Sequence, residues 1–277
     1  MKFLRTIFGK SNAADGGTKV SLSDFRDAVL EELKEQAPEL SIEKDEGDVA
    51  LINIKSPDGI EGQSNMTNFH KELALFDGTL EDAIQKVIEG VLIAVRPAPP
   101  AALSDLLPLI RSAAYLGNAS NETSQKISRP FCGELLEICM VDSPSALRGM
   151  TKDDLDQLDT EAPLSVAREN VRKLLPKTFR DNSLEFAVLF SIEDHAHLAP
   201  SLVLFDEFWA NVDKDYPNGC IIALPRRDQL FLINLADPNA VENAQHLVKV
   251  TFEDNFNLLT SELYIRRAGA ISLLDVA

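Results

Sequence analysis

The chain has 277 residues, of which 45% are hydrophobic and 26% are charged, and this composition is typical of a globular protein and excludes a disordered one. Its net charge is −17, which opposes non-specific binding to nucleic acid or to anionic lipid. The sequence has neither a secretory signal nor an apolar run of about 18 residues, so we expect a cytoplasmic protein without stable membrane insertion.

Residues 1–18 are predicted to form a tail and a flexible linker. If residues 2–9 are helical, four apolar side chains share one face, namely Phe3, Leu4, Ile7 and Phe8. Such a face suggests weak anchoring to a membrane or to a partner. The alternative is a tail that folds against its own domain or has no fixed structure, because so short a helix is unstable alone.

A small α/β unit is predicted for residues 19–96. Ser21 is placed to cap a helix that ends at Pro38. Two short β-like runs follow at 40–44 and 49–55, separated by a turn-prone sequence. The unit therefore opens with a helix and a hairpin.

The second part of this unit contains one ambiguous run and one well-marked helix. Residues 66–75 fit either a strand or a helix, whereas Thr79 and Asp82 have the spacing of a capping box that starts a helix. The proline-rich segment at 96–103 interrupts regular structure and is the predicted boundary between two units.

A larger α+β domain is predicted for residues 105–277. The expected elements are strands at 106–115 and 135–141, a helix from Thr151, a helix at 164–175, a buried strand at 184–191, a helix capped by Ser201, a hairpin at 219–234, a helix from Asp237 and a C-terminal hairpin. Helices alternate with hairpins, which favours an α+β fold of two subdomains, with mixed or antiparallel sheets and flanking helices.

Three stretches of this domain carry a likeness to a known family. They are PLIRS at 108–112, a helix from TKDDL to ENVRKLLP at 151–176, and GCIIALPRRDQLFLI at 219–233. Together they resemble the YtpQ-like family of uncharacterised bacterial proteins over roughly residues 105–277. The resemblance implies a bacterial protein but brings no activity, cofactor or catalytic residue. The basic tail and the proline-rich segment depart from that family.

Motifs for nucleotide binding, zinc proteolysis and serine hydrolysis are absent from the sequence. His195 and His197 form a His-x-His pair that is a weak metal candidate, and the alternative is an exposed polar loop. Cys132 would need one of these histidines as a base to act as a nucleophile, and the alternative is a structural cysteine. We therefore predict no metal and no cofactor.

A small set of residues forms the candidate binding surface, namely Arg111, Trp209, Arg226, Arg227 and Asp228. Arg111 lies on a predicted strand and, if buried, requires either an internal carboxylate or a ligand anion, because an unpaired buried charge is strongly unfavourable. The hairpin tip is either a binding surface or a solvated turn. Trp209 is either a core residue or an anchor for a partner.

These features favour a non-catalytic protein-binding or regulatory module whose partner is another protein. The competing class is a hydrolase or other enzyme with a site around His195, His197 and Cys132. Convergence of these three residues and a carboxylate in one pocket would favour the enzyme.

Removal of residues 1–18 is expected to leave the melting temperature within a few degrees of that of the whole chain, because the linker separates the tail from the folded body. Thermal unfolding followed by circular dichroism measures this. A larger decrease would show that Phe3, Ile7 and Phe8 belong to the core.

Overall fold

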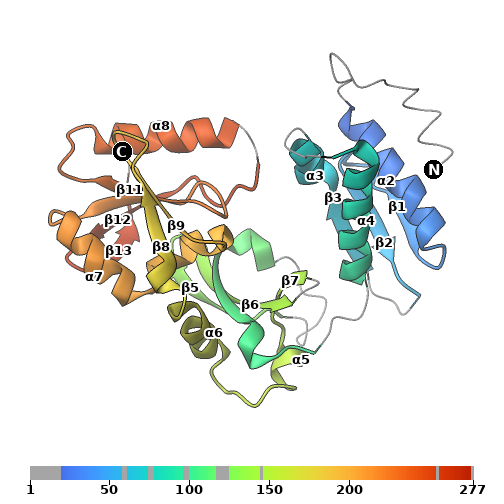
Figure 1. The fold of residues 1–277 in the computed structure, drawn as a ribbon, viewed down its shortest axis with the longest axis horizontal. Coiled ribbons are helices and arrows are strands. Elements are labelled where there is room, and N and C mark those ends of the chain that lie inside the picture. The colour runs from blue at the N-terminus through green and yellow to red at the C-terminus, as the bar shows by residue number, and fades with distance from the viewer. Residues whose placement is uncertain are drawn as a thin grey trace. The chain divides into compact units, whose positions relative to one another are not determined.

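The structure is a computed structural model, and it describes seven stretches of the chain, which are 20–57, 61–73, 78–95, 100–116, 125–143, 146–253 and 256–275. The predicted tail lies outside these ranges. The chain divides into two compact units, residues 1–99 and 100–277, and the division falls within the proline-rich segment (Figure 1). The described residues form helices and antiparallel sheets, which confirms the predicted α+β class.

The first unit is a small antiparallel sheet with helices. Its elements are α2 (Leu22–Gln36), β1 (Ser41–Lys44), β2 (Leu51–Lys55), β3 (Glu61–Asn65), α3 (Met66–Glu72) and α4 (Leu80–Val95). The sheet order is β1-β2-β3, and the β1–β2 hairpin was predicted whereas β3 was not. The polar sequence of β3, EGQSN, lacks the apolar alternation that marks a strand.

Side-chain caps fix where the helices of this unit begin. The Ser21 hydroxyl accepts a hydrogen bond from the Asp24 amide at 3.1 Å, as predicted. Thr79 and Asp82 form the predicted reciprocal box, with Thr79 N to Asp82 Oδ2 at 2.9 Å and Asp82 N to Thr79 Oγ1 at 3.1 Å. The ambiguous run after β3 is helical, because the Asn65 side chain caps α3.

The second unit contains two antiparallel sheets and the helices that pack on them. Its elements are η2 (Leu103–Asp105), β4 (Leu106–Ser112), η3 (Ala113–Leu116), β5 (Ser128–Cys132), β6 (Leu135–Ser143), β7 (Ala146–Gly149), α5 (Lys152–Leu155), α6 (Pro163–Arg172), η4 (Leu175–Lys177), β8 (Thr178–Asp181), β9 (Val188–Ile192), η5 (Ala196–Leu204), α7 (Asp206–Asp215), β10 (Cys220–Ala223), β11 (Leu230–Asn234), α8 (Ala240–Glu253), β12 (Leu263–Arg267) and β13 (Ala270–Leu273). One sheet has the order β4-β6-β5 with β7 also on β6, and the other has the order β13-β12-β10-β11-β9-β8.

The predicted helix cap at Ser201 is wrong. Ser201 lies inside the 3-10 helix η5, is fully buried, and accepts a hydrogen bond from the Ile110 amide of β4 at 3.3 Å. The α-helix α7 begins only at Asp206. Pro200 has no amide hydrogen to donate, which disfavours a regular α-helix through this run. The predicted strand at 184–191 is also shorter, because β9 begins at Val188.

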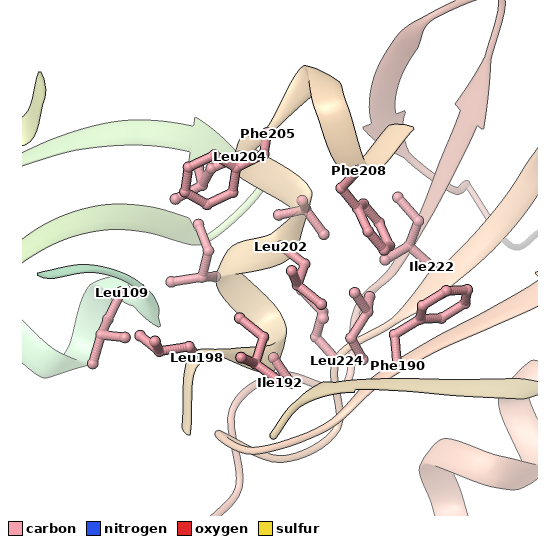
Figure 2. Packing of buried hydrophobic residues seen from close by; sticks show 14 of the residues in the cluster. Leu109, Phe190, Ile192, Leu198, Leu202, Leu204, Phe205, Phe208, Ile222 and Leu224 are labelled. Atoms are coloured by element: carbon pink, nitrogen blue, oxygen red, sulfur yellow. The ribbon is translucent and has the colours of Figure 1, made fainter. Parts of the chain in front are cut away.

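Helix η5 joins the two sheets of the second unit into one core. Its Leu198 and Leu202 are fully buried in the hydrophobic cluster that also contains Leu109 of β4, Phe190 of β9 and Ile222 of β10. Figure 2 shows Leu198 and Leu202 between Leu109 on one side and Phe190 and Ile222 on the other. The apolar character of η5 therefore reflects contact with two layers.

Two buried carboxylates, Glu137 in the first of these sheets and Asp154 on the adjacent helix α5, are held in ion pairs. Glu137 of β6 is 1% exposed and accepts hydrogen bonds from Arg168 of α6 at 2.7 Å and from Arg129 of β5 at 2.6 Å. Asp154 of α5 accepts two hydrogen bonds from Arg148 of β7, both at 2.6 Å. These pairs fasten α5 and α6 to the sheet.

The Asp154→Asn variant is expected to lower the free energy of unfolding at pH 7 by about 1–3 kcal/mol, because it removes charge-assisted hydrogen bonds. Burial alone would raise the pKa of Asp154, but hydrogen bonds from Arg148 and Thr151 outweigh it and lower the pKa. The stabilisation is therefore present above the unfolded pKa of about 3.9 and is lost as the pH falls through the folded pKa.

Urea unfolding at pH 7 and at acidic pH measures both effects, and the variant should lose less stability than the parent on acidification. Asp153→Asn, at an exposed neighbouring position, is the matched control and should change stability by less than about 0.5 kcal/mol. Equal effects of the two substitutions would contradict the role of the Arg148 pair.

Candidate functional site

Trp209 lies in the core and not on a surface. Its side chain is 2% exposed, and its indole nitrogen donates a hydrogen bond to the carbonyl of Val203 at 2.9 Å. The guanidinium carbon of Arg266 lies 4.2 Å from the centroid of its ring, and Arg266 pairs with Asp213 at 2.8 Å. This arrangement packs α7 on β12 and leaves Trp209 almost no area for contact with a partner.

The predicted hairpin of β10 and β11 is confirmed, but its tip is half-buried and is not a freely solvated turn. The amide of Arg227 donates to the carbonyl of Asn257 at 2.9 Å, and the guanidinium carbon of Arg226 lies 4.7 Å from the Phe256 ring centroid. Asp228 faces Arg226 at 3.9 Å, which is too long for a hydrogen bond. A second segment of chain therefore packs against the tip.

Arg111 is buried on β4, and no described residue pairs with it as an opposite charge. It is 6% exposed, and among the described residues its side-chain hydrogen bond is that of Nη1 to the carbonyl of Ile110, at 2.8 Å. Burial, and then the like charge of Arg227, lower the pKa of Arg111 to about 10. The internal salt bridge that the sequence suggested is not formed within the described part of the chain.

His197 of the His-x-His pair lies near Arg111, and His195 lies beside His197. Their ring centroids are 6.0 Å apart, and Nε2 of His197 is buried without a hydrogen-bond partner in the described structure. Burial lowers the pKa of His197; Asp142 opposes this shift, whereas His195 and Arg111 add to it. His197 is therefore neutral at pH 7. In the described residues no group of three or more His, Cys, Asp or Glu side chains could hold a metal ion.

Cys132 has different neighbours from those of His197. Burial raises the pKa of the Cys132 thiol, and the charge of Glu262 raises it further, while a hydrogen bond from the Gly133 amide opposes them. A nucleophilic cysteine needs a lowered pKa, and this environment shifts the pKa in the opposite direction. The geometry gives no support to a Cys–His pair.

A groove of about 700 Å³ lies between β8 and α7, and we call it the α7–β8 groove. Its floor is apolar and buried, formed by Phe190, Phe208 and Val212. Its rim carries exposed ion pairs, which are Arg172–Glu207 at 2.7 Å and Arg180–Asp215 at 2.6 Å. Sequence reasoning missed this groove, because its lining comes from segments that only the tertiary structure brings together.

Comparison with models of protein families, with curated proteins and with solved structures gives no match. The likeness to the YtpQ-like family therefore stays a prediction. Within the described ranges, every helix is too short or too polar to span a lipid bilayer.

The purified protein is expected to contain no stoichiometric zinc, nickel or iron, because His195 and His197 bring no third ligand of the described chain with them. Elemental analysis by mass spectrometry measures this, with the His195→Ala/His197→Ala variant as the control. One equivalent of metal that disappears in this variant would contradict the expectation and favour an enzyme.

Proposed function

We propose that the protein is a non-catalytic binding module that takes up an extended segment of a partner protein along the outer edge of β8. The observation that carries this proposal is an open sheet edge beside an apolar groove. The six-stranded sheet ends at β8, which pairs with β9 on its inner side. An edge strand presents unpaired amide and carbonyl groups that can bind another strand.

The side chains of β8 fit such a role. Phe179 is 51% exposed, a high value for an aromatic ring on a strand, and it lies on the opposite face of β8 from Thr178 and Arg180. The hydroxyl oxygen of Thr178, at the start of the strand, is buried without a hydrogen-bond partner among the described residues. The exposed edge thus offers an apolar contact through Phe179.

The α7–β8 groove supplies the specificity that main-chain pairing lacks. A strand added beside β8 would place alternate side chains over the buried floor formed by Phe190 and Phe208. Four of the charged residues at the rim are already in the ion pairs Arg172–Glu207 and Arg180–Asp215, so they do not require a strongly charged segment. We therefore expect an extended segment with apolar residues at alternate positions and little net charge.

Replacing Phe179 with lysine should weaken binding of such a partner by a factor of about 30, since a buried aromatic anchor contributes about 2 kcal/mol to an interface. The matched control is Leu273→Lys, because Leu273 is 47% exposed on β13, at the opposite edge of the same sheet. A photo-cross-linker at position 179 identifies the partner, and titration with the purified partner gives the dissociation constants.

Hydrogen exchange measured with and without the partner then locates the contact. The amides of β8 should exchange more slowly in the complex, whereas those of β13 should not change. The proposal fails if Phe179→Lys binds the partner as tightly as the parent, or if the amides of β8 gain no protection. A partner that binds both lysine variants equally would use another surface.

A further inference from the structure

We propose that Arg111, Arg227 and His197 form a binding site for the phosphate group of a small molecule. The site lies where β4, the start of η5 and the tip of the β10–β11 hairpin meet. Its three residues are not part of the α7–β8 groove, so the inference goes beyond the proposed function and does not depend on it.

The first argument compares Arg111 with the other buried charges of the described chain. The others all have an opposite charge within 2.8 Å, in the pairs Arg26–Asp27, Glu137–Arg168, Asp154–Arg148 and Arg266–Asp213. Arg111 is equally buried, but the charge that acts on it is that of Arg227, which has the same sign. Among the buried charged residues of the described chain, Arg111 therefore differs from the other four, each of which has a partner of opposite charge.

The second argument concerns hydrogen bonds. A guanidinium group has five N–H donors, and among the described residues Arg111 uses Nη1 to donate to the Ile110 carbonyl, at 2.8 Å. The carboxylate of Asp228 faces Arg226, not Arg111. The remaining Arg111 donors have no acceptor among the described residues, and no described carboxylate pairs with its charge, so an anionic ligand would satisfy both.

Two further polar groups lie near the arginines. Nε2 of His197 is buried and unpartnered, and its ring lies close enough to Arg111 for their charges to interact. The phenol of Tyr115, at the end of η3, is half-buried and feels the charges of both Arg111 and Arg227. Each of these groups can donate a hydrogen bond to an oxygen of a bound anion.

The charge and the donor count favour phosphate over carboxylate. A phosphate monoester carries close to two negative charges at pH 7, which balances two guanidinium groups, whereas one carboxylate would leave a positive charge unpaired. The planar guanidinium group forms two parallel hydrogen bonds with a phosphate, and the remaining oxygens can accept from His197 and Tyr115. The ligand class that we infer is therefore a phosphate dianion, either as free phosphate or as the phosphate group of a monoester.

The test is thermal unfolding in inorganic phosphate compared with sodium chloride of equal ionic strength. A ligand present at about 100 times its dissociation constant should raise the melting temperature by on the order of 5 °C. Calorimetric titration with inorganic phosphate, glycerol phosphate and acetate then gives the affinities, which separate free phosphate from a monoester and both from a carboxylate.

Two variants and a control assign the effect to the site. Arg227→Ser should bind phosphate at least about tenfold more weakly, since it removes a charge-assisted contact, and it leaves the backbone hydrogen bond to Asn257 in place. Arg267→Ser, at an exposed position on β12, should bind as the parent does. Arg111→Met should lose the phosphate response while keeping or raising the melting temperature in phosphate-free buffer, because it removes an uncompensated buried charge.

Three results would overturn the inference. The first is a parent protein that phosphate does not stabilise beyond the effect of sodium chloride. The second is an equal response of the parent and the Arg227→Ser variant. The third is binding of acetate as tight as that of phosphate, which would assign the site to carboxylates. If Arg111→Met does not fold, the comparison of Arg227→Ser with Arg267→Ser decides the question.

Discussion

The second unit depends on the burial of η5 between its two sheets. The helix contributes Leu198 and Leu202 to the common cluster, and the buried hydroxyl of Ser201 accepts a hydrogen bond from the Ile110 amide on β4. Strand β4 pairs with β6 on its other side, so this bond satisfies an amide that an edge strand would otherwise leave exposed. The same contact places His197, near the start of η5, close to Arg111 on β4.

The free-energy cost of removing a charge from water explains which charged residues are buried in this protein. Glu137 and Asp154 are buried because arginines from other elements meet them, and these pairs also orient α5 and α6. Arg266 is held between Asp213 and the Trp209 ring. Arg111 has no oppositely charged partner among the described residues. The proposal of a ligand rests on this difference from the other buried charges, and not on the burial of Arg111 alone.

The side chains that the sequence suggested for catalysis lie in different environments. The environment of Cys132 raises the pKa of its thiol, and the residues that act on it differ from those around His197. In contrast, the open edge of β8 suits the proposed partner segment, and Arg111 on β4 with Arg227 at the hairpin tip suits the proposed anion. The proposed module, with these two binding surfaces, would account for both features without a catalytic step.

The sequence by itself determined the elements whose signals are local. The caps at Ser21 and Thr79 and the hairpin at 219–234 were predicted, because hydrogen bonds between near neighbours and alternating apolar residues fix them. The tertiary structure decided the form of η5 and the meeting of Arg111 with Arg227. An apolar run such as η5 takes its conformation from the layers on both sides, and two arginines far apart in the chain carry no signal of their proximity.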